Sequence, residues 1–408
     1  MVKCRGPRTR RWSSLSPRAV LAGVALLSGC HSDSARAPTS ATDSAGVRIV
    51  ESTEPVWGAT APWEVIRNPL LDLTATGRGP EYEFFRVTDA VWLSDGRLVV
   101  ANDGTSEIRL YSARGEYQAA AGRNGEGPGE FRRIRTMSRM RGDSVAVYDV
   151  LLNRLTILGP DGSVGRVISL RETFRRARHL RAFDDSTFLG LASYTPSNHL
   201  LGEYRIPYSL IQLGPEGAVL DTIATIDGLA GFRTPRADGP LPFPKNGHLA
   251  TLGREIVIGD ADSLAYERFS GPGIRSQTVS VPGYDLALTS EQRDSTEQVW
   301  LHRSDGRPHP PDIVDLLERL PFPTHKPGYT RLLLDGGGYV WAARYYRGMY
   351  AGQTVEWEIF APSGEWLGRI ATPAGFDVLQ IGSREILGVQ RDELEVEHVQ
   401  VLRLIRSG

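Results

Sequence analysis

One glycine-rich segment has the composition of a loop that could bind phosphate. It reads GRNGEGPGEF from Gly122 to Phe131, with four glycines in its first eight residues. A phosphate-binding loop would need a Lys-Ser or Lys-Thr pair that opens a helix, whereas Pro-Gly-Glu-Phe follows here. We interpret the segment as a connector between strands, in which glycines permit sharp bends and Phe131 fills the space between sheets. In the alternative interpretation, Arg123, Glu126 and Glu130 face a ligand.

Polar residues that follow several short apolar strands are a second candidate for chemistry. If the fold brings their oxygens together, carboxylates and amides could hold a hard cation such as calcium. The alternative is that they cap strands and satisfy loop backbone, as Asp and Asn commonly do. Asp149, Asn153 and Asp260 are the metal-ligand candidates. The candidates for the ligand-binding face are Asn102, Asp103, Asp149, Asn153, Asp260, Asp262, Arg344, Tyr346, Arg391 and Asp392, together with the loop from Tyr194 to Pro207.

The sequence has no motif of a known catalytic centre. It contains neither the Gly-x-Ser-x-Gly turn of a serine hydrolase nor the His-Glu-x-x-His motif of a zinc protease. The histidines are scattered without metal-ligand spacing, so we expect each of them to be structural or solvated and predict no catalytic residue. These histidines are His179, His199, His248, His302, His309, His325 and His398.

The elements that must position these residues form a repeat. From about residue 85 onward, a turn with Gly or Asp, a short apolar strand, a polar loop and an alternating strand recur. The turns at Gly96 and Gly142 are 46 residues apart, and so are those at Gly336 and Gly382. About 45 residues with roughly four strands is the size of a propeller blade. The apolar strands of the six units begin at Leu98, Val145, Phe188, Ile256, Tyr339 and Ile386.

This repeat predicts an all-β fold, a six-bladed β-propeller over residues 46–408, with a pair of β-sandwiches as the competing architecture. Strand material at Trp63–Ile66, with Val47–Glu51 before it, is expected to supply the outer strand that the last blade lacks and so to close the ring. Two helix-opening segments between about residues 288 and 320 predict a small helical insertion between blades four and five, packed on the ring.

Two segments resemble those of a known family. Residues 149–162 resemble an NHL-type propeller repeat, with an acid, the Asn153-Arg154 pair, an alternating strand and an Asp-Gly turn. The segment from Gly122 to Phe131 resembles the signature of the bacterial six-bladed β-propeller lipoproteins, whose role is uncharacterised. The resemblance covers nearly the whole chain after the leader. It implies the propeller fold and a location in the cell envelope, and it implies no established activity.

The N-terminus resembles the leader of an exported lipoprotein. Residues 1–29 have six basic side chains and no acids, and they include an apolar run too short to span a bilayer. The run ends in Leu27-Ser28-Gly29-Cys30, which resembles the lipobox, so we expect a lipid on Cys30; an ordinary secretory signal is the alternative. Residues 30–45 are small and polar and are expected to be a flexible tether. The predicted location is the outer or inner membrane of the envelope, facing the periplasm or the surface.

Composition limits the partners and cofactors. Cys4 would leave with the leader, so the mature chain would have no disulfide and no thiolate metal site. Loss of the leader changes the formal net charge from −1 to about −7, and an acidic surface argues against nucleic acid as a partner. We expect contact with a membrane through the lipid anchor. We expect no cofactor, with calcium as the one alternative.

Three functions remain compatible with the sequence. The favoured one is a lipid-anchored, non-catalytic binding or scaffold protein for a protein, peptide or glycan ligand. The second is a hydrolase similar to the calcium-dependent lactonase and gluconolactonase propellers, which requires a central metal site. The third is a subunit of a larger envelope complex that uses the helical insertion.

Overall fold

The computed structural model describes residues 38–173, 177–183, 185–193, 201–302, 306–345 and 354–407. The leader, Cys30 and Tyr346 lie outside these ranges, so the predictions made for them fall outside the described residues. Within the described ranges, no helix is long and apolar enough to cross a membrane.

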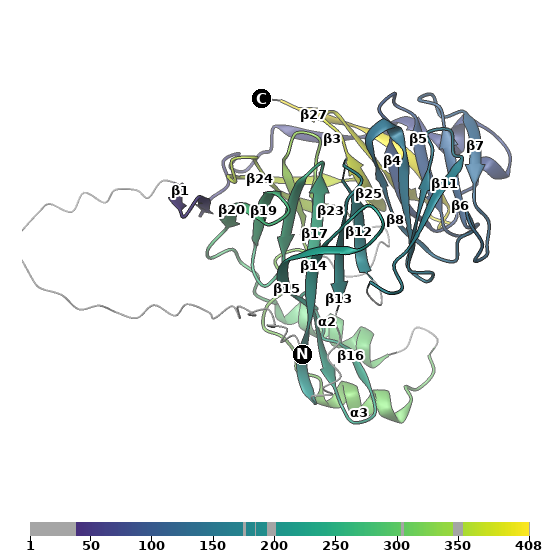
Figure 1. The fold of residues 1–408 in the computed structure, drawn as a ribbon. Coiled ribbons are helices and arrows are strands. Elements are labelled where there is room, and N and C mark those ends of the chain that lie inside the picture. The colour runs from purple at the N-terminus through teal and green to yellow at the C-terminus, as the bar shows by residue number, and fades with distance from the viewer. Residues whose placement is uncertain are drawn as a thin grey trace, which may run out of the picture. The chain divides into compact units, whose positions relative to one another are not determined.

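Strands dominate the part of the chain that the structure describes and form six sheets there (Figure 1). Consecutive strands of the chain pair antiparallel within each sheet. The first three sheets contain β4 (Val87–Trp92), β5 (Leu98–Asn102), β6 (Glu107–Tyr111) and β7 (Tyr117–Ala121); β8 (Ile134–Arg139), β9 (Val145–Asp149), β10 (Arg154–Leu158) and β11 (Val164–Ser169); and β12 (Ala177–Ala182), β13 (Phe188–Ser193), β14 (Gly202–Leu213), β15 (Val219–Arg233) and β16 (Asp238–Pro240). The last three contain β17 (His248–Leu252), β18 (Glu255–Gly259), β19 (Ala265–Gly271) and β20 (Ile274–Ser280); β21 (Arg331–Leu334), β22 (Val340–Ala343), β23 (Val355–Phe360) and β24 (Trp366–Thr372); and β25 (Phe376–Ile381), β26 (Glu385–Arg391) and β27 (Glu397–Arg406).

The first strands of the sheets lie beside one another. β4 contacts β8, and β8 contacts β12; β17 contacts β21, β21 contacts β25, and β25 contacts β4. The last sheet therefore returns to the first. This is how a propeller arranges its blades, with the first strand of each lining a central channel.

The apolar core is divided among the junctions between sheets. In the described part of the chain it forms six clusters, each built from two successive sheets. One of them joins the sixth sheet to the first, where Leu387 and Val401 pack with Leu98 and Val100. Side chains of both faces of each sheet are thus buried, which explains why strands such as β5 and β9 are buried at every position.

N-terminal strands complete two different sheets. β3 (Trp63–Asp72) pairs antiparallel with β27 and so adds the fourth strand of the sixth sheet. β2 (Val47–Ser52) instead pairs in parallel with β20 of the fourth sheet. The expectation that Val47–Glu51 would join β3 in the last sheet is therefore wrong. The edge of β20 is open to pairing and lies within reach of the chain that precedes β3.

Part of the predicted tether is a strand. β1 (Thr39–Ser44) pairs antiparallel with β2 through a two-residue turn at Ala45 and Gly46. Both turn residues have positive φ, 50° and 78° respectively, as a type I′ hairpin requires. The sequence 39–44 is polar because most of β1 is solvent-exposed, and composition alone hid the strand.

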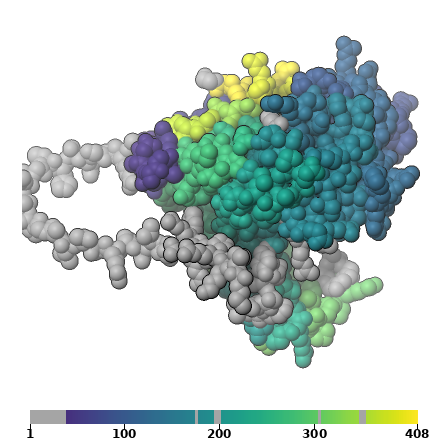
Figure 2. All heavy atoms as spheres, in the orientation of Figure 1, coloured from purple at the N-terminus to yellow at the C-terminus, as the bar shows by residue number. Residues whose placement is uncertain are grey.

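Two insertions lie together beside the sheets (Figures 1 and 2). The first is the long hairpin of β14 and β15, and its pairing begins at Gly202, so the prediction of a loop from Tyr194 to Pro207 is wrong for residues 202–207. The second contains α2 (Ser290–Leu301) and α3 (Pro311–Arg319), between β20 and β21. The segment that leads from this hairpin to β17 contacts the second insertion, where the ring of Phe243 lies against that of Phe322, with centroids 6.0 Å apart. We call the two insertions together the cap.

Smaller elements complete the chain. They are α1 (Leu73–Thr76) and two 3₁₀ turns, at Pro80–Tyr82 and Arg141–Asp143. α2 begins with a capping box in which Thr289 and Gln292 bond each other's backbone N–H groups. α3 begins at Pro311 and buries Leu316 on its apolar face.

Candidate functional site

The strand order places one set of loops on a common side. In an antiparallel sheet of four, the loop between the second and third strands lies at the same end as the connector that leads to the next sheet. We call this end the connector edge. It collects the loops after β5, β9, β18 and β26, the connector from β7 to β8, and both parts of the cap. The sequence-predicted ligand-face residues within the described ranges lie at this edge.

The glycine-rich segment is the connector from β7 to β8. Gly122 has a φ of 98°, and a Cβ there would lie 2.7 Å from the Phe131 ring and 2.8 Å from the Ser106 carbonyl oxygen, so only glycine fits. Phe131 is fully buried in the cluster between the first two sheets. Its N–H donates to the Arg123 carbonyl oxygen at 2.9 Å. The segment therefore joins two sheets and has no helix that could receive a phosphate.

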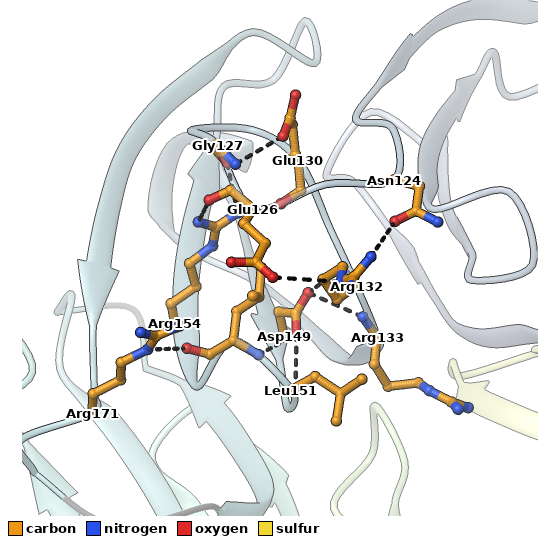
Figure 3. Close-up of polar contacts among 11 residues, drawn as sticks. Asn124, Glu126, Gly127, Glu130, Arg132, Arg133, Asp149, Leu151, Arg154 and Arg171 are labelled. Carbon is orange, nitrogen blue, oxygen red and sulfur yellow. Dashed lines mark hydrogen bonds and ion pairs between the residues drawn. The ribbon is translucent and has the colours of Figure 1, made fainter.

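Arg154, from the pair that resembles an NHL repeat, holds this connector from the next sheet (Figure 3). Its guanidinium donates to the carbonyl oxygen of Glu126 at 2.6 Å, to that of Gly127 at 2.7 Å, and to that of Glu130. The carboxylate of Glu130 accepts from the Gly127 N–H at 2.8 Å and pairs with Arg123 at 2.6 Å, and these partners lower its pKa. The side chain of Arg123 itself is 81% exposed.

Two buried aspartates fasten the same connector. Asp149 is fully buried and accepts four backbone N–H bonds, from Arg132 and Arg133 of the connector and from Leu151 and Leu152 of its own loop (Figure 3). Asp103 accepts from the N–H of Ile134 at 2.8 Å, and its other oxygen pairs with Arg86 at 2.8 Å. Both carboxylates cap backbone, so Asp149 and Asp103 have structural partners for their oxygens.

Asn153, Asp260 and Asp262 are likewise engaged with their own chain. Asn153 accepts from the Tyr148 hydroxyl at 2.9 Å and donates to the Leu170 carbonyl oxygen at 3.0 Å. Asp260 accepts from the Asp262 N–H at 3.0 Å, and burial raises its pKa. Asp262 pairs with Arg205 of the long hairpin at 2.7 Å, which ties the loop after β18 to the cap.

The last two sheets hold the remaining candidates. Arg344 pairs with Glu356 and lies 3.7 Å from the buried Glu358. Arg391 pairs with Glu397 at 2.8 Å. Asp392 is exposed and accepts from two N–H groups of its own loop. Among the described residues, no group of three His, Cys, Asp or Glu side chains is arranged to hold a metal ion, and Asp149, Asn153 and Asp260 do not come together in one.

A cluster that the sequence analysis missed lies on the first strands, at the connector edge. Its members come from five sheets, and each is the first, second or third residue of its strand. We call it the mouth cluster. It consists of Arg135 on β8, Arg178 and His179 on β12, His248 on β17, Arg331 on β21 and Asp377 on β25. Arg331 pairs with Asp377 at 2.8 Å, and this ion pair joins the first strands of the fifth and sixth sheets.

A second, deeper layer lies farther along the same strands. Arg181 of β12 donates to a carboxylate oxygen of Asp89 on β4 at 2.8 Å and to the carbonyl oxygen of Met137 on β8 at 2.6 Å. The same oxygen of Asp89 accepts from the Met137 N–H at 2.8 Å. The ion pair and its bonds to the Met137 backbone therefore join three sheets at this level.

The electrostatics of the mouth cluster are positive. Burial, followed by the charges of Arg178 and Arg331, lowers the pKa of His248 to about 3. Burial and the charges of Arg181 and Arg135 likewise hold the pKa of His179 well below its ordinary value. Both imidazoles are therefore neutral at neutral pH. Burial and the surrounding cationic field act in the same direction on both rings.

Local sequence gave little signal for this cluster. His179 and His248 are 69 positions apart, and only the repeat of first strands relates them. The strands predicted from apolar runs were the second strands of each unit, such as Leu98–Val100, whereas the first strands are more polar. One pattern could have revealed the cluster. It is the recurrence of Arg or His at the start of the strand that precedes each apolar strand.

Comparison with known proteins defines the fold class. No protein-family model and no curated protein matches the sequence. A solved structure from Bacteroides fragilis, named “Putative exported protein”, has a TM-score of 0.52 at 10% identity, over 88% of this chain and 100% of that one. A member of the DUF4221 family from Bacteroides vulgatus has 0.49 at 10% identity, over 85% and 99%. Regucalcin, a calcium-binding protein from Agrobacterium tumefaciens, has 0.41 at 10% identity, over 82% and 95%.

These likenesses concern the fold alone, because every identity is far below 25%. Within the described ranges, the six sheets and the contacts between their first strands are those of a propeller, and the Bacteroides fragilis structure is similar in fold. The chain has a mostly β, propeller-like fold.

Proposed function

We propose that this chain is a six-bladed β-propeller of NHL-like repeats, anchored in the cell envelope by a lipid on Cys30, which binds a ligand at the connector edge without transforming it. The lipobox-like sequence and the basic leader support the anchor. The Bacteroides fragilis neighbour is named “Putative exported protein”, which is consistent with that location. The six sheets, with the last one completed by β3, support the blade count and the closure of the ring.

The mouth cluster is the observation that carries the binding proposal. Three arginines and two neutral histidines from four sheets lie at the connector-edge ends of the first strands, where Arg331 pairs with Asp377 of the sixth sheet. Like charges held together cost folding free energy, and side chains with strongly shifted pKa values gather at functional sites. Polar loop residues predicted from sequence, such as Asp149 and Asp262, bond backbone groups or pair with side chains of the opposite charge. Arg178, in contrast, has no carboxylate partner among the described residues and lies over the ring of Tyr208.

The same cluster favours binding over the calcium-dependent hydrolase. A divalent cation at the channel mouth would meet three guanidinium groups, and the oxygens of Asp149 and Asn153 already serve the backbone or neighbouring side chains. Calorimetric titration with calcium tests this preference. Heat of calcium binding with a one-to-one stoichiometry, together with hydrolysis of a lactone, would favour the hydrolase hypothesis instead.

Ligand screening tests the binding proposal. The purified chain is heated in the presence of separate panels of peptides, peptidoglycan fragments and organic acids, because a ligand that binds only the folded state raises the melting temperature. We expect at least one class to stabilise the protein, and NMR spectra of the ligand to be unchanged after prolonged incubation. The proposal fails if no class stabilises the protein or if the ligand is consumed.

A further inference from the structure

The residues of the mouth cluster indicate the chemical class of its ligand. This inference rests on the proposed function. Its members share one level of the channel. Arg135, Arg178 and Asp377 are the second residues of their strands, and His248 and Arg331 are the first. Members on successive sheets are neighbours, since Arg331 pairs with Asp377 at 2.8 Å and the charges of Arg178 and Arg331 both act on His248. The members therefore follow one another from sheet to sheet at the connector edge.

Solvent reaches the mouth cluster. Arg135 is exposed, and the side chains of Arg178, His179, His248, Arg331 and Asp377 are half-buried. A solute can therefore reach the guanidinium groups from the connector edge. Farther along the same strands, Arg181 bonds Asp89 and the backbone of Met137, so these residues of three sheets are already engaged with one another. The solvent-reached groups of the mouth cluster therefore lie at the connector edge.

Charge sets the class of ligand. Asp377 pairs with Arg331, whereas Arg178 has no carboxylate partner among the described residues. On the cap side, the carboxylate of Asp262 pairs with Arg205 and lies 3.7 Å from Lys245, and Arg205 also donates to the backbone carbonyl oxygen of Asp260. The excess of positive charge therefore belongs to the mouth cluster, and the protein walls concentrate its field on the opening.

The donor geometry also favours an oxygen anion. A guanidinium presents a planar fork of N–H groups that matches two oxygens of a carboxylate or phosphate. Arg178 is held over the ring of Tyr208, with its Cζ 5.2 Å from the ring centroid, so part of its orientation is fixed before a ligand arrives. A neutral imidazole offers one further N–H donor.

We infer that the mouth cluster binds a small ligand through a carboxylate or phosphate group, with Arg178 and Arg331 as the main contacts and Arg135 and the two histidines around them. The rest of such a ligand would project from the channel toward the cap. The hairpin of β14 and β15 and the connector of α2 and α3 both lie at this edge, so they are placed to contact the uncharged part.

Calorimetric titration of the full chain with two probes, citrate and inorganic phosphate, tests the inference at constant ionic strength. We expect at least one probe to bind with one-to-one stoichiometry. Arg178→Gln should weaken that binding by about 10-fold to 100-fold, because a hydrogen bond to a charged group is lost. Arg114→Gln removes the same charge from an exposed turn at the opposite end of the first sheet and should leave binding unchanged.

The outcomes separate the ligand classes and the two proposals. Binding of citrate alone assigns a carboxylate ligand, and binding of phosphate alone assigns a phosphorylated one. Failure of both probes in the millimolar range, or equal effects of Arg178→Gln and Arg114→Gln, would overturn the inference. If the thermal screen finds an uncharged ligand whose binding survives Arg178→Gln, the oxyanion site is wrong while the binding function stands. Circular dichroism of each variant checks that it is folded.

Discussion

Replacing Asp149 should show how strongly one buried carboxylate holds the connector between the first two sheets. Its side chain is fully buried and accepts four backbone N–H bonds of 2.6 to 3.1 Å. A hydrogen bond to a charged group contributes about 1.5–3 kcal/mol. In Asp149→Ala, water can reach the N–H groups near the exposed Arg132, Arg133 and Leu151, whereas the N–H of the buried Leu152 would lose its partner. We therefore expect a loss of about 3–5 kcal/mol, below the simple sum.

Urea unfolding followed by tryptophan fluorescence measures this loss. The matched control is Asp392→Ala, because Asp392 also accepts two N–H bonds in a loop between second and third strands but is exposed. Its loss should be at most about 1 kcal/mol. Asp149→Asn keeps one acceptor oxygen and should fall between the two, which keeps the test informative if Asp149→Ala does not fold. Equal losses for Asp149→Ala and Asp392→Ala would refute the structural role.

Three further predictions concern pH, the connector surface and the anchor. The folded pKa of His248 is about 3, whereas an imidazole in the unfolded chain takes up its proton near pH 6.5. The free energy of unfolding should therefore fall as pH drops below 6.5, by at most about 1.4 kcal/mol per pH unit and less where solvent screens the ring. Urea unfolding at pH 6.5 and 5.5 should show a smaller difference for His248→Gln than for the unchanged protein, and an equal difference would contradict this. Arg123→Ala removes an exposed pair with Glu130 and should lower stability by about 0–1 kcal/mol; lost ligand binding at unchanged stability would instead assign Arg123 to the ligand face. Cys30→Ser should abolish labelling by an alkyne-tagged fatty acid and release the chain from membranes, and persistent labelling would refute the anchor.

The sequence predicted the strands well where burial is two-sided. Leu98–Val100 and Val145–Tyr148 are apolar because each sheet packs on a neighbour at both faces, so the second strand of each unit appears as a continuous apolar run. The Asp161-Gly162 turn was also readable, since Gly162 has a φ of 83°. Local patterns of this kind therefore predict the strands and turns of the sheets.

The sequence did not reveal contacts between distant segments. The parallel pairing of β2 with β20 joins Val50 to Val279, and no local pattern specifies that choice of edge. The composition of β1 predicts a tether rather than a strand, because most of its side chains face solvent and are polar. The mouth cluster shows the same limit, since Arg178 and Arg331 become neighbours of His248 only when the sheets are arranged around one axis.

Hydrogen exchange tests most directly the central claim that a ligand binds at the connector edge. Exchange is measured by mass spectrometry with and without a ligand that raises the melting temperature in the screen. Slower exchange should appear at the starts of β8, β12, β17 and β21, around residues 134–136, 177–180, 248–250 and 331–333. Slower exchange confined to the opposite end of the sheets, in the turns at residues 93–97 and 112–116, would contradict the account.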